Sequence, residues 1–170
     1  MIKQFELNGV AYPLDHLQGF RLDIPRSDPL LAPARLQVTF SCHVFSERWD
    51  ANKHPPERRF VVDSEDRAFC PVRYGCSIGL EEHIRYLALG KAYEVRDGNG
   101  IRNHFFYATA EKLPYPIFFR LSQASRIKGV HGLLHIISAY QKPNLKARHA
   151  CQSIKFARLV HQRCSPKPEL

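Results

Sequence analysis

A segment of strict alternation between Arg35 and Phe45 constrains the fold of this 170-residue chain more than any other feature. Apolar side chains recur there at every second position, and polar side chains lie between them. This period predicts a strand with one buried and one polar face, and such a strand needs partner strands and a covering layer. His43 lies near the end of the predicted strand, on its polar face.

Two hairpins and two further strands are predicted as partners for this strand. Asn8-Gly9 lies between short apolar segments and is typical of a type I′ turn, which predicts a hairpin over residues 3–14. A second hairpin is predicted over residues 93–109, and strands over residues 117–120 and 132–140. The last of these strands is apolar on both faces, so we expect it to be central in the sheet.

Two segments have the signals of helices. Ser77 is predicted to be the N-cap of a helix over residues 78–89, because a serine hydroxyl accepts a hydrogen bond from the first helical turn. A second, basic helix is predicted over residues 146–163. Residues 15–34 and 46–66 are rich in proline or charge, and we expect them to be irregular.

The connections between the predicted strands are short, which implies antiparallel pairing. The predicted fold class is therefore α+β: an antiparallel sheet of four or more strands, with an N-terminal β-hairpin, one packed helix and a basic C-terminal helix. We expect residues 1–143 to form a single α+β domain, and residues 144–170 to form the basic helix and a loose tail.

The excess positive charge of the chain lies in its last third. The chain has 25 Lys and Arg against 16 Asp and Glu, and residues 112–168 contain eleven Lys or Arg but no Asp or Glu. A one-sided positive field favours a polyanionic partner, above all RNA, although a solvated basic surface is the alternative. The candidate nucleic-acid-binding residues are Arg126, Lys128, Lys142, Lys146, Arg148, Lys155 and Arg158.

Several classes of protein are disfavoured by the sequence. The five cysteines are irregularly spaced and fit neither a disulfide framework nor a zinc site, so we expect a reducing, cytoplasmic location and no metal. The chain lacks a glycine-rich phosphate loop, so no cofactor is expected. No segment approaches the roughly 20 apolar residues of a membrane span, and the N-terminus does not resemble a signal peptide.

Five residues are candidates for chemistry at a phosphate group. A histidine at a strand end could act as a general base or acid, an arginine could bind a phosphate in bidentate fashion, and hydroxyl groups could position the substrate. The alternatives are structural: a solvated histidine, a serine that only caps a helix, and a tyrosine that packs in the core. The candidates are His43, Arg73, Ser77, Ser138 and Tyr140.

Several motifs resemble those of a group of small uncharacterised bacterial and prophage proteins, some of which are labelled stationary phase growth adaptation protein. The motifs are Asn8-Gly9-Val10-x-Tyr12-x-Leu14-x-His16-Leu17, Phe40-Ser41-x-His43-x-Phe45, Arg73-Tyr74-x-x-Ser77-x-x-Leu80, Asn103 with Phe106, Phe118-Phe119-x-Leu121-Ser122-x-Ala124-x-Arg126 and Ser138-Ala139-Tyr140. The resemblance covers residues 8–140 and implies a place in toxin–antitoxin loci for some members.

Ser138-Ala139-Tyr140 at the end of a late strand also resembles the barnase–EndoU–colicin–RelE group of ribonucleases. That resemblance implies metal-independent RNA cleavage through attack by the ribose 2′-hydroxyl. It implies His43 as general base or acid, Arg73 at the scissile phosphate, and Ser138 or Tyr140 in support. A toxin of this kind would have an acidic antitoxin protein as its partner, which the basic last third would suit.

Three functions follow as hypotheses. The first is a toxin-like cytoplasmic RNA-binding protein, in particular a metal-independent endoribonuclease. The second is a non-catalytic growth inhibitor that binds a host protein, and the third is a phage regulatory protein that binds nucleic acid without cleaving it. RNA cleavage separates the first from the others, and a steep loss of affinity with salt would mark nucleic-acid binding.

Overall fold

The computed structural model describes residues 3–26, 32–96, 102–110, 112–124, 127–143, 145 and 152–164. Its main element is a seven-stranded sheet in the order β12-β8-β9-β10-β11-β4-β3. The strands are β3 (Phe20–Ile24), β4 (Ala34–Phe40), β8 (Lys91–Arg96), β9 (Arg102–Ala110), β10 (Leu113–Gln123), β11 (Gly132–Ala139) and β12 (Ser153–Lys155). The predicted α+β class is thus confirmed, and β11 is a central strand as expected.

The main sheet is mixed, which corrects the prediction of a purely antiparallel one. β11 pairs with β4 in parallel, with Leu134 opposite Val38, whereas its other neighbour β10 is antiparallel to it. Parallel strands need a long crossover connection, and the chain between β4 and β11 is long enough to supply one. Short local connections revealed the hairpins, but they carry no information about this distant pair.

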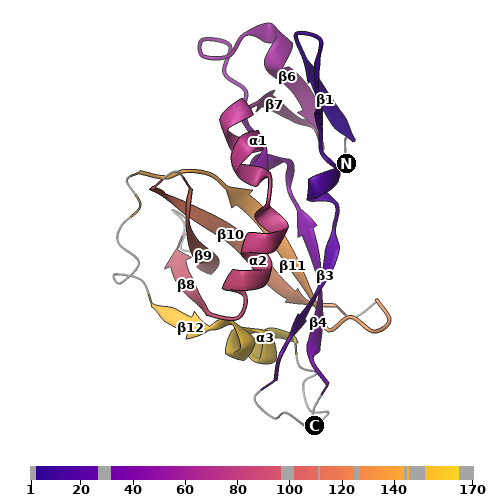
Figure 1. The fold of residues 1–170 in the computed structure, drawn as a ribbon, viewed down its shortest axis with the longest axis vertical. Coiled ribbons are helices and arrows are strands. Elements are labelled where there is room, and N and C mark those ends of the chain that lie inside the picture. The colour runs from indigo at the N-terminus through magenta and orange to yellow at the C-terminus, as the bar shows by residue number, and fades with distance from the viewer. Residues whose placement is uncertain are drawn as a thin grey trace.

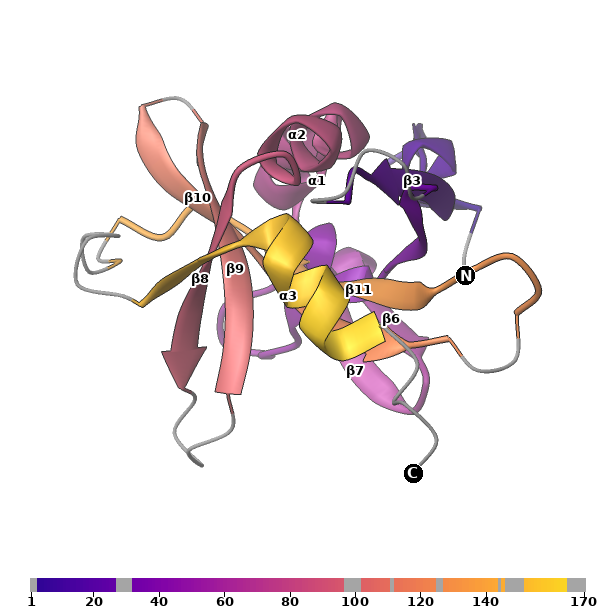
Figure 2. The same ribbon diagram turned by 90° about the horizontal axis from the view of Figure 1, so that it is seen from below.

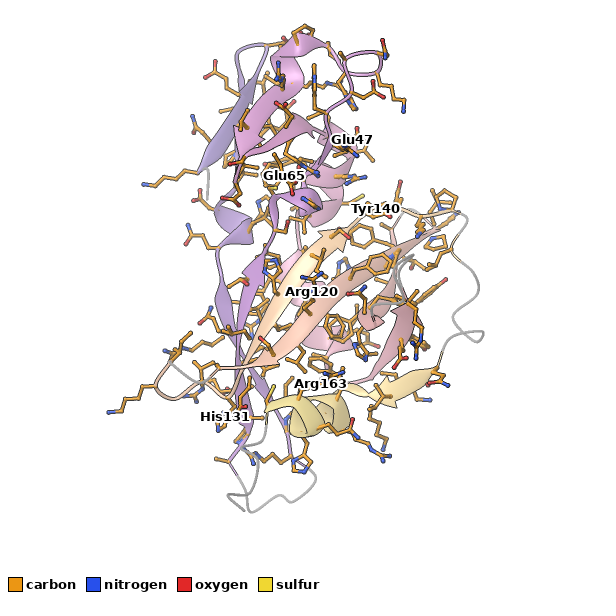
Figure 3. The ribbon with its side chains drawn as sticks, turned by 180° about the vertical axis from the view of Figure 1, so that it is seen from behind. Glu47, Glu65, Arg120, His131, Tyr140 and Arg163 are labelled. Carbon is orange, nitrogen blue, oxygen red and sulfur yellow. The ribbon has the colours of Figure 1, made fainter. Side chains whose placement is uncertain are left out.

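The helices cover one face of the main sheet. They are α1 (Pro71–Ser77), α2 (Leu80–Leu87) and α3 (Phe156–Cys164). Figure 1 shows α1 and α2 in front of the strands, and Figure 2 shows α3 lying across the lower end of the sheet. Phe156 of α3 packs against the rings of Phe106 and Phe119, whose centroids lie 4.9 and 5.6 Å away. Among the described residues, no helix lies over the opposite face of β10 and β11 (Figure 3).

A second, smaller sheet packs at one end of the main sheet, at the top of Figure 1. It contains β5 (Ser46–Arg48), β7 (Glu65–Phe69) and β6 (Arg59–Val62), in that order. The hairpin of β1 (Gln4–Leu7) and β2 (Val10–Pro13) covers it through stacked rings of Phe5 and Phe69, 4.5 Å apart. In their described residues, the segments 15–34 and 46–66 are therefore not wholly irregular, because β3 lies in the first and β5, β6, the β6–β7 turn and the start of β7 lie in the second.

The predicted helix over residues 78–89 corresponds to α2, and a further short helix that was not predicted, α1, precedes it. Gly79 adopts a left-handed conformation with φ of 84°, which ends the helical path and separates α1 from α2. Ser77 is the last residue of α1 rather than the N-cap of a helix, and Ile78 is 58% exposed. Leu80 and Ile84 of α2 are fully buried.

The basic C-terminal helix begins later than predicted, at Phe156. Ser153–Lys155 form β12, which pairs with the otherwise unpaired edge of β8, and the Phe156 N–H continues this contact by donating to the Gly90 carbonyl. Residues 146–151 lie outside the described part of the chain. In that described part, no helix is long and apolar enough to span a membrane.

Candidate functional site

Polar side chains gather where the small sheet meets the end of the main sheet. They come from the 3₁₀ turn η2 (Cys42–Val44) after β4, from β5 and β7, from α1, and from the residue that follows β11. We call this group the junction cluster, and Figure 3 shows Glu47, Glu65 and Tyr140 of it on the face of the molecule without helices. Its members are His43, Glu47, Glu65, Arg67, Arg73 and Tyr140.

His43 is held in η2 and not at a strand end, which corrects the sequence prediction. β4 ends at Phe40, and the Ser41 hydroxyl then caps the turn by accepting a hydrogen bond from the His43 N–H at 3.2 Å. The imidazole Nε2 lies 3.1 Å from Glu65 Oε2, and the two side chains are 34% and 58% exposed. A carboxylate at this distance orients the ring, while solvent and a ligand can still reach it.

Arg67 is the buried support of this pair. Its guanidinium donates from Nε to the Ser46 hydroxyl and from Nη2 to the Ser46 carbonyl, each at 3.2 Å, and Nη1 lies 3.6 Å from Glu65 Oε2. Burial lowers the pKa of this guanidinium from its ordinary value. Arg67 therefore fixes the Glu65 carboxylate from beneath, and the carboxylate in turn fixes His43.

Arg73 belongs to the junction cluster, but its guanidinium is already engaged. Nη1 donates to the carbonyls of Ser46 at 2.6 Å and His43 at 3.3 Å, and Nη2 lies 4.0 Å from Glu47 Oε2. The guanidinium also stacks over the Tyr140 ring, with Cζ 4.5 Å from its centre. Arg73 thus ties α1 to η2, β5 and the end of β11, and its predicted role at a phosphate stays a prediction.

Ser77 has a structural position at the other end of α1. Its side chain is buried, and its hydroxyl donates to the Tyr74 carbonyl at 2.7 Å. His16 Nε2 lies 2.7 Å from the Ser77 hydroxyl oxygen. These bonds join α1 to the 3₁₀ turn η1 (Asp15–Leu17). Neither of these hydrogen-bond partners of Ser77 belongs to the junction cluster.

Ser138 and Tyr140 line a groove on the helix-free face of the sheet, next to the junction cluster. The groove has a volume of about 380 Å³, and we call it the basic groove because three of its lining side chains are cationic. A β-bulge opposite Phe118 turns both Ile137 and Ser138 toward this face. The sequence prediction that Ser138 and Tyr140 share a face is confirmed. The basic groove is lined by Val95, Arg96, Asn103, Phe118, Arg120, Ile137, Ser138, Tyr140 and Lys142.

His135 connects the basic groove to the junction cluster. It lies directly opposite Arg120 in the β10–β11 register, and its Nδ1 is 3.0 Å from the Thr39 hydroxyl. Burial, together with the charges of Arg120 and His43, lowers the pKa of His135 below its ordinary value. Arg120, which lines the groove, is therefore paired across the strands with a second imidazole, His135.

The predicted nucleic-acid-binding residues fall on separate surfaces. Lys142 lines the basic groove, with its ammonium 5.6 Å from the centre of the Phe118 ring. Lys128 is exposed in the turn between β10 and β11. Lys155 is exposed on β12, and Arg158 of α3 lines a hollow of about 290 Å³ on the helical side. Arg126, Lys146 and Arg148 lie outside the described residues.

Sequence reasoning missed Glu65 and Arg67, the two residues that complete the His43 site. Both lie in β7, which follows a two-residue turn at Asp63 and Ser64 with φ of 49° and 65°. The apolar segment Phe60-Val61-Val62 before this turn was the available signal of a strand. A strand assignment there would have turned Glu65 and Arg67 toward the same face.

No group of three or more His, Cys, Asp or Glu side chains in the described residues is arranged to hold a metal ion. The model of the YjaZ family matches residues 4–164 of the chain. No curated protein and no solved structure gives a significant match. The family match supports the resemblance to small bacterial proteins, and the resemblance to ribonucleases stays a prediction.

Proposed function

The chain belongs to the YjaZ family, and from its site we propose that it is a toxin-like RNA-binding protein that cleaves RNA without a metal ion. One observation carries this proposal: the exposed His43–Glu65 pair, 3.1 Å apart, opens beside a groove lined by cations and aromatic rings. An acid–base pair next to a phosphate-binding surface is what metal-independent RNA cleavage requires.

The chemistry follows from which nitrogen of His43 is free. Nε2 faces Glu65, and no hydrogen bond to Nδ1 is found in the described part of the chain. Glu65 therefore holds the tautomer in which Nε2 carries the proton and Nδ1 is basic. Nδ1 would remove the proton of the ribose 2′-hydroxyl, which then attacks the adjacent phosphorus.

The negative charge that grows on the phosphate needs a cation. Arg120 is exposed, lies opposite His135 and lines the basic groove, so its guanidinium is free to bind phosphate oxygens. Arg73 is less suited, because two backbone carbonyls already occupy it. The 5′-oxygen would leave with a proton from water, and the other product would be a 2′,3′-cyclic phosphate.

The decisive experiment is RNA cleavage in the presence of a chelator. We expect the wild-type protein to cleave single-stranded RNA, and His43→Asn and Glu65→Gln to lower the rate by about 10²- to 10⁴-fold. Matched controls are His83→Asn and Glu82→Gln, which change exposed residues of α2. Arg73→Ala is a poor probe, because it removes the donors that hold η2 in place. Intact RNA after long incubation with folded wild-type protein would overturn the catalytic proposal.

A toxin-like role adds a test in cells. Induced wild-type protein should arrest bacterial growth with fragmentation of total RNA, and His43→Asn should do neither. The positive last third of the chain suits an acidic antitoxin, which we propose as the protein partner.

A second function, binding without cleavage, is favoured by a specific observation. Two of the predicted catalytic residues, Arg73 and Ser77, have their polar groups engaged by the chain itself. A non-catalytic growth inhibitor or a phage regulatory protein needs only the basic surface. Growth arrest with intact RNA that survives His43→Asn would favour this alternative.

A further inference from the structure

We infer that the basic groove binds an unpaired segment of RNA, with a base stacked on the rings of Phe118 and Tyr140. The inference rests on the proposed function and makes its substrate specific: single-stranded RNA, held on the helix-free face of β9–β11 and led from there to His43 and Glu65. Double-stranded RNA and an acidic protein are the occupants that the test must exclude.

The first argument is a continuous row of aromatic rings across the strands. The centroids of Tyr93 and Phe105 are 5.5 Å apart, those of Phe105 and Phe118 are 5.5 Å apart, and those of Phe118 and Tyr140 are 6.4 Å apart. Phe105 is fully buried and lies in register with Phe118, so it supports that ring from the side. Phe118 and Tyr140 are the two rings of the row that line the groove.

The second argument is the charge around these rings. Arg96, Arg120 and Lys142 line the groove, and no acidic side chain is among its described lining residues. A single strand presents flat base faces and phosphates in alternation, which matches rings bordered by cations. A duplex hides its base faces inside the stack, so it could use the cations but not the rings.

The third argument is the position of Lys142. Its ammonium lies over the Phe118 ring, 5.6 Å from the centre, and its backbone N–H is fixed by the Pro114 carbonyl at 2.9 Å. A base that stacks on Phe118 would displace the flexible Lys142 ammonium. Because the Lys142 backbone is fixed, the displaced ammonium would stay within reach of the adjoining phosphate. Lys142 would then contact phosphate without distinguishing sequences.

The groove also leads to the proposed chemistry. Arg120 and Tyr140 both line the groove, and the Arg73 guanidinium that lies over the Tyr140 ring donates to the His43 carbonyl. A strand that stacks on Phe118 and binds Arg120 would thus place a neighbouring phosphate near the His43–Glu65 pair. Substrate binding and cleavage would then involve different residues and can be measured separately.

The test is binding measured with His43→Asn protein, so that cleavage does not interfere. Fluorescence anisotropy would compare a short labelled single-stranded RNA with the same sequence in a duplex. In this background we expect Phe118→Leu to weaken single-strand binding by about 5- to 150-fold, the effect of losing one stacked base. Lys142→Gln should lower the slope of log affinity against log salt by about 0.7. Tyr86→Leu is the matched control, because this ring of α2 is 77% exposed and lies outside the groove.

Each outcome decides between the two proposals. Equal affinity for duplex and single strand, or unchanged affinity in both Phe118→Leu and Lys142→Gln, would overturn the groove as a single-strand site and leave cleavage as a separate question. Selective single-strand binding that depends on Phe118, in a protein whose wild type does not cleave RNA, would support the groove and overturn the catalytic proposal. Binding of an acidic protein at the groove with no RNA affinity would overturn both. Because Lys142→Gln changes only a surface charge, it remains informative if Phe118→Leu unfolds the protein.

Discussion

Two His–Glu pairs lie on either side of the small sheet, and their comparison shows what separates a reactive imidazole from a structural one. His43 and Glu65 approach to 3.1 Å, and His54 and Glu47 approach to 3.2 Å. The distances are the same within their precision, but the His54 side chain is 9% exposed, against 34% for His43. Pair geometry alone therefore does not identify the site.

The second ring nitrogen makes the difference. The Asp50 N–H donates to His54 Nδ1 at 3.0 Å, so Nε2 of that ring carries the proton and donates it to Glu47. The ring also packs beside Trp49, with centroids 5.6 Å apart. Both nitrogens of His54 are thus engaged in holding the loop after β5, whereas His43 keeps Nδ1 available to a substrate in the described structure.

The largest expected effect is that substituting the two histidines has opposite consequences, a loss of cleavage for His43 and a loss of stability for His54. His43→Asn should lower RNA cleavage by about 10²- to 10⁴-fold while hardly changing stability, because its ring is partly exposed. His54→Asn should leave the cleavage rate near that of the wild type and lower the free energy of unfolding by about 1–2 kcal/mol, because it breaks hydrogen bonds of a nearly buried ring. Cleavage kinetics and urea denaturation of both variants test this. A loss of cleavage in both variants would mean that exposure does not separate their roles.

Arg67 should have the next largest effect, on stability. Arg67→Met keeps the apolar stem but leaves the buried Ser46 hydroxyl and carbonyl without two donors, at a cost of about 2–3 kcal/mol. Arg59→Met on the neighbouring strand β6 is the matched control, because its bond to Asp66 is exposed and should contribute little to stability. Chemical denaturation would measure both changes. Equal losses in the two variants would show that Arg67 does not support the junction cluster.

The main sheet was largely predictable because local signals encode it. The alternation that ends at Phe40 and the apolar strand that begins at Gly132 each depend on neighbouring residues, as does the Asn8-Gly9 turn of the separate N-terminal hairpin. The parallel pairing of β4 with β11 depends on residues nearly a hundred positions apart, and no local period reports it. The mixed character of the sheet therefore appeared only in the structure.

The candidate site was predictable only in part, for the same reason. His43 and Arg73 were identified by residue type, but the partner of His43 lies 22 positions away on a strand within a charged, proline-containing segment. Glu65 becomes relevant only after β7 pairs with β5 and turns it toward η2. Pairing in space creates the site, so composition could suggest its chemistry but not its geometry.

The pH dependence of stability should report the imidazoles that burial keeps neutral. Burial lowers the pKa of His16, and also that of His135 with help from Arg120 and His43. Below the ordinary histidine pKa of about 6.5, these imidazoles bind protons in the unfolded chain but stay neutral in the folded protein. The stability contributed by the neutral rings is therefore present above that pH and is lost as the pH falls toward the lowered pKa.

We expect the free energy of unfolding to decrease between about pH 7 and pH 5, and His16→Gln to make this decrease shallower. Urea titrations across that range would measure the slopes. His83→Gln removes an exposed imidazole instead and is the control. A slope that His16→Gln leaves unchanged would show that the proton uptake arises elsewhere in the molecule.

The smallest effect concerns the two tight hairpin turns. Asn8 and Gly9 join β1 to β2, and Asp63 and Ser64 join β6 to β7, with positive φ at all four residues. Ser64, at φ of 65°, has a side chain in a conformation that glycine adopts without strain. Ser64→Gly should therefore raise the free energy of unfolding by about 0.5 kcal/mol, since relief of strain slightly exceeds the added freedom of the unfolded chain. Gly9→Ala, at φ of 76°, should lower it by about 1 kcal/mol. Glu65 directly follows the Asp63-Ser64 turn, so RNA cleavage by Ser64→Gly is informative as well. Unchanged cleavage would show that the small sheet keeps its register without strain at this turn. A fall in cleavage would show that the strained turn positions the Glu65 carboxylate.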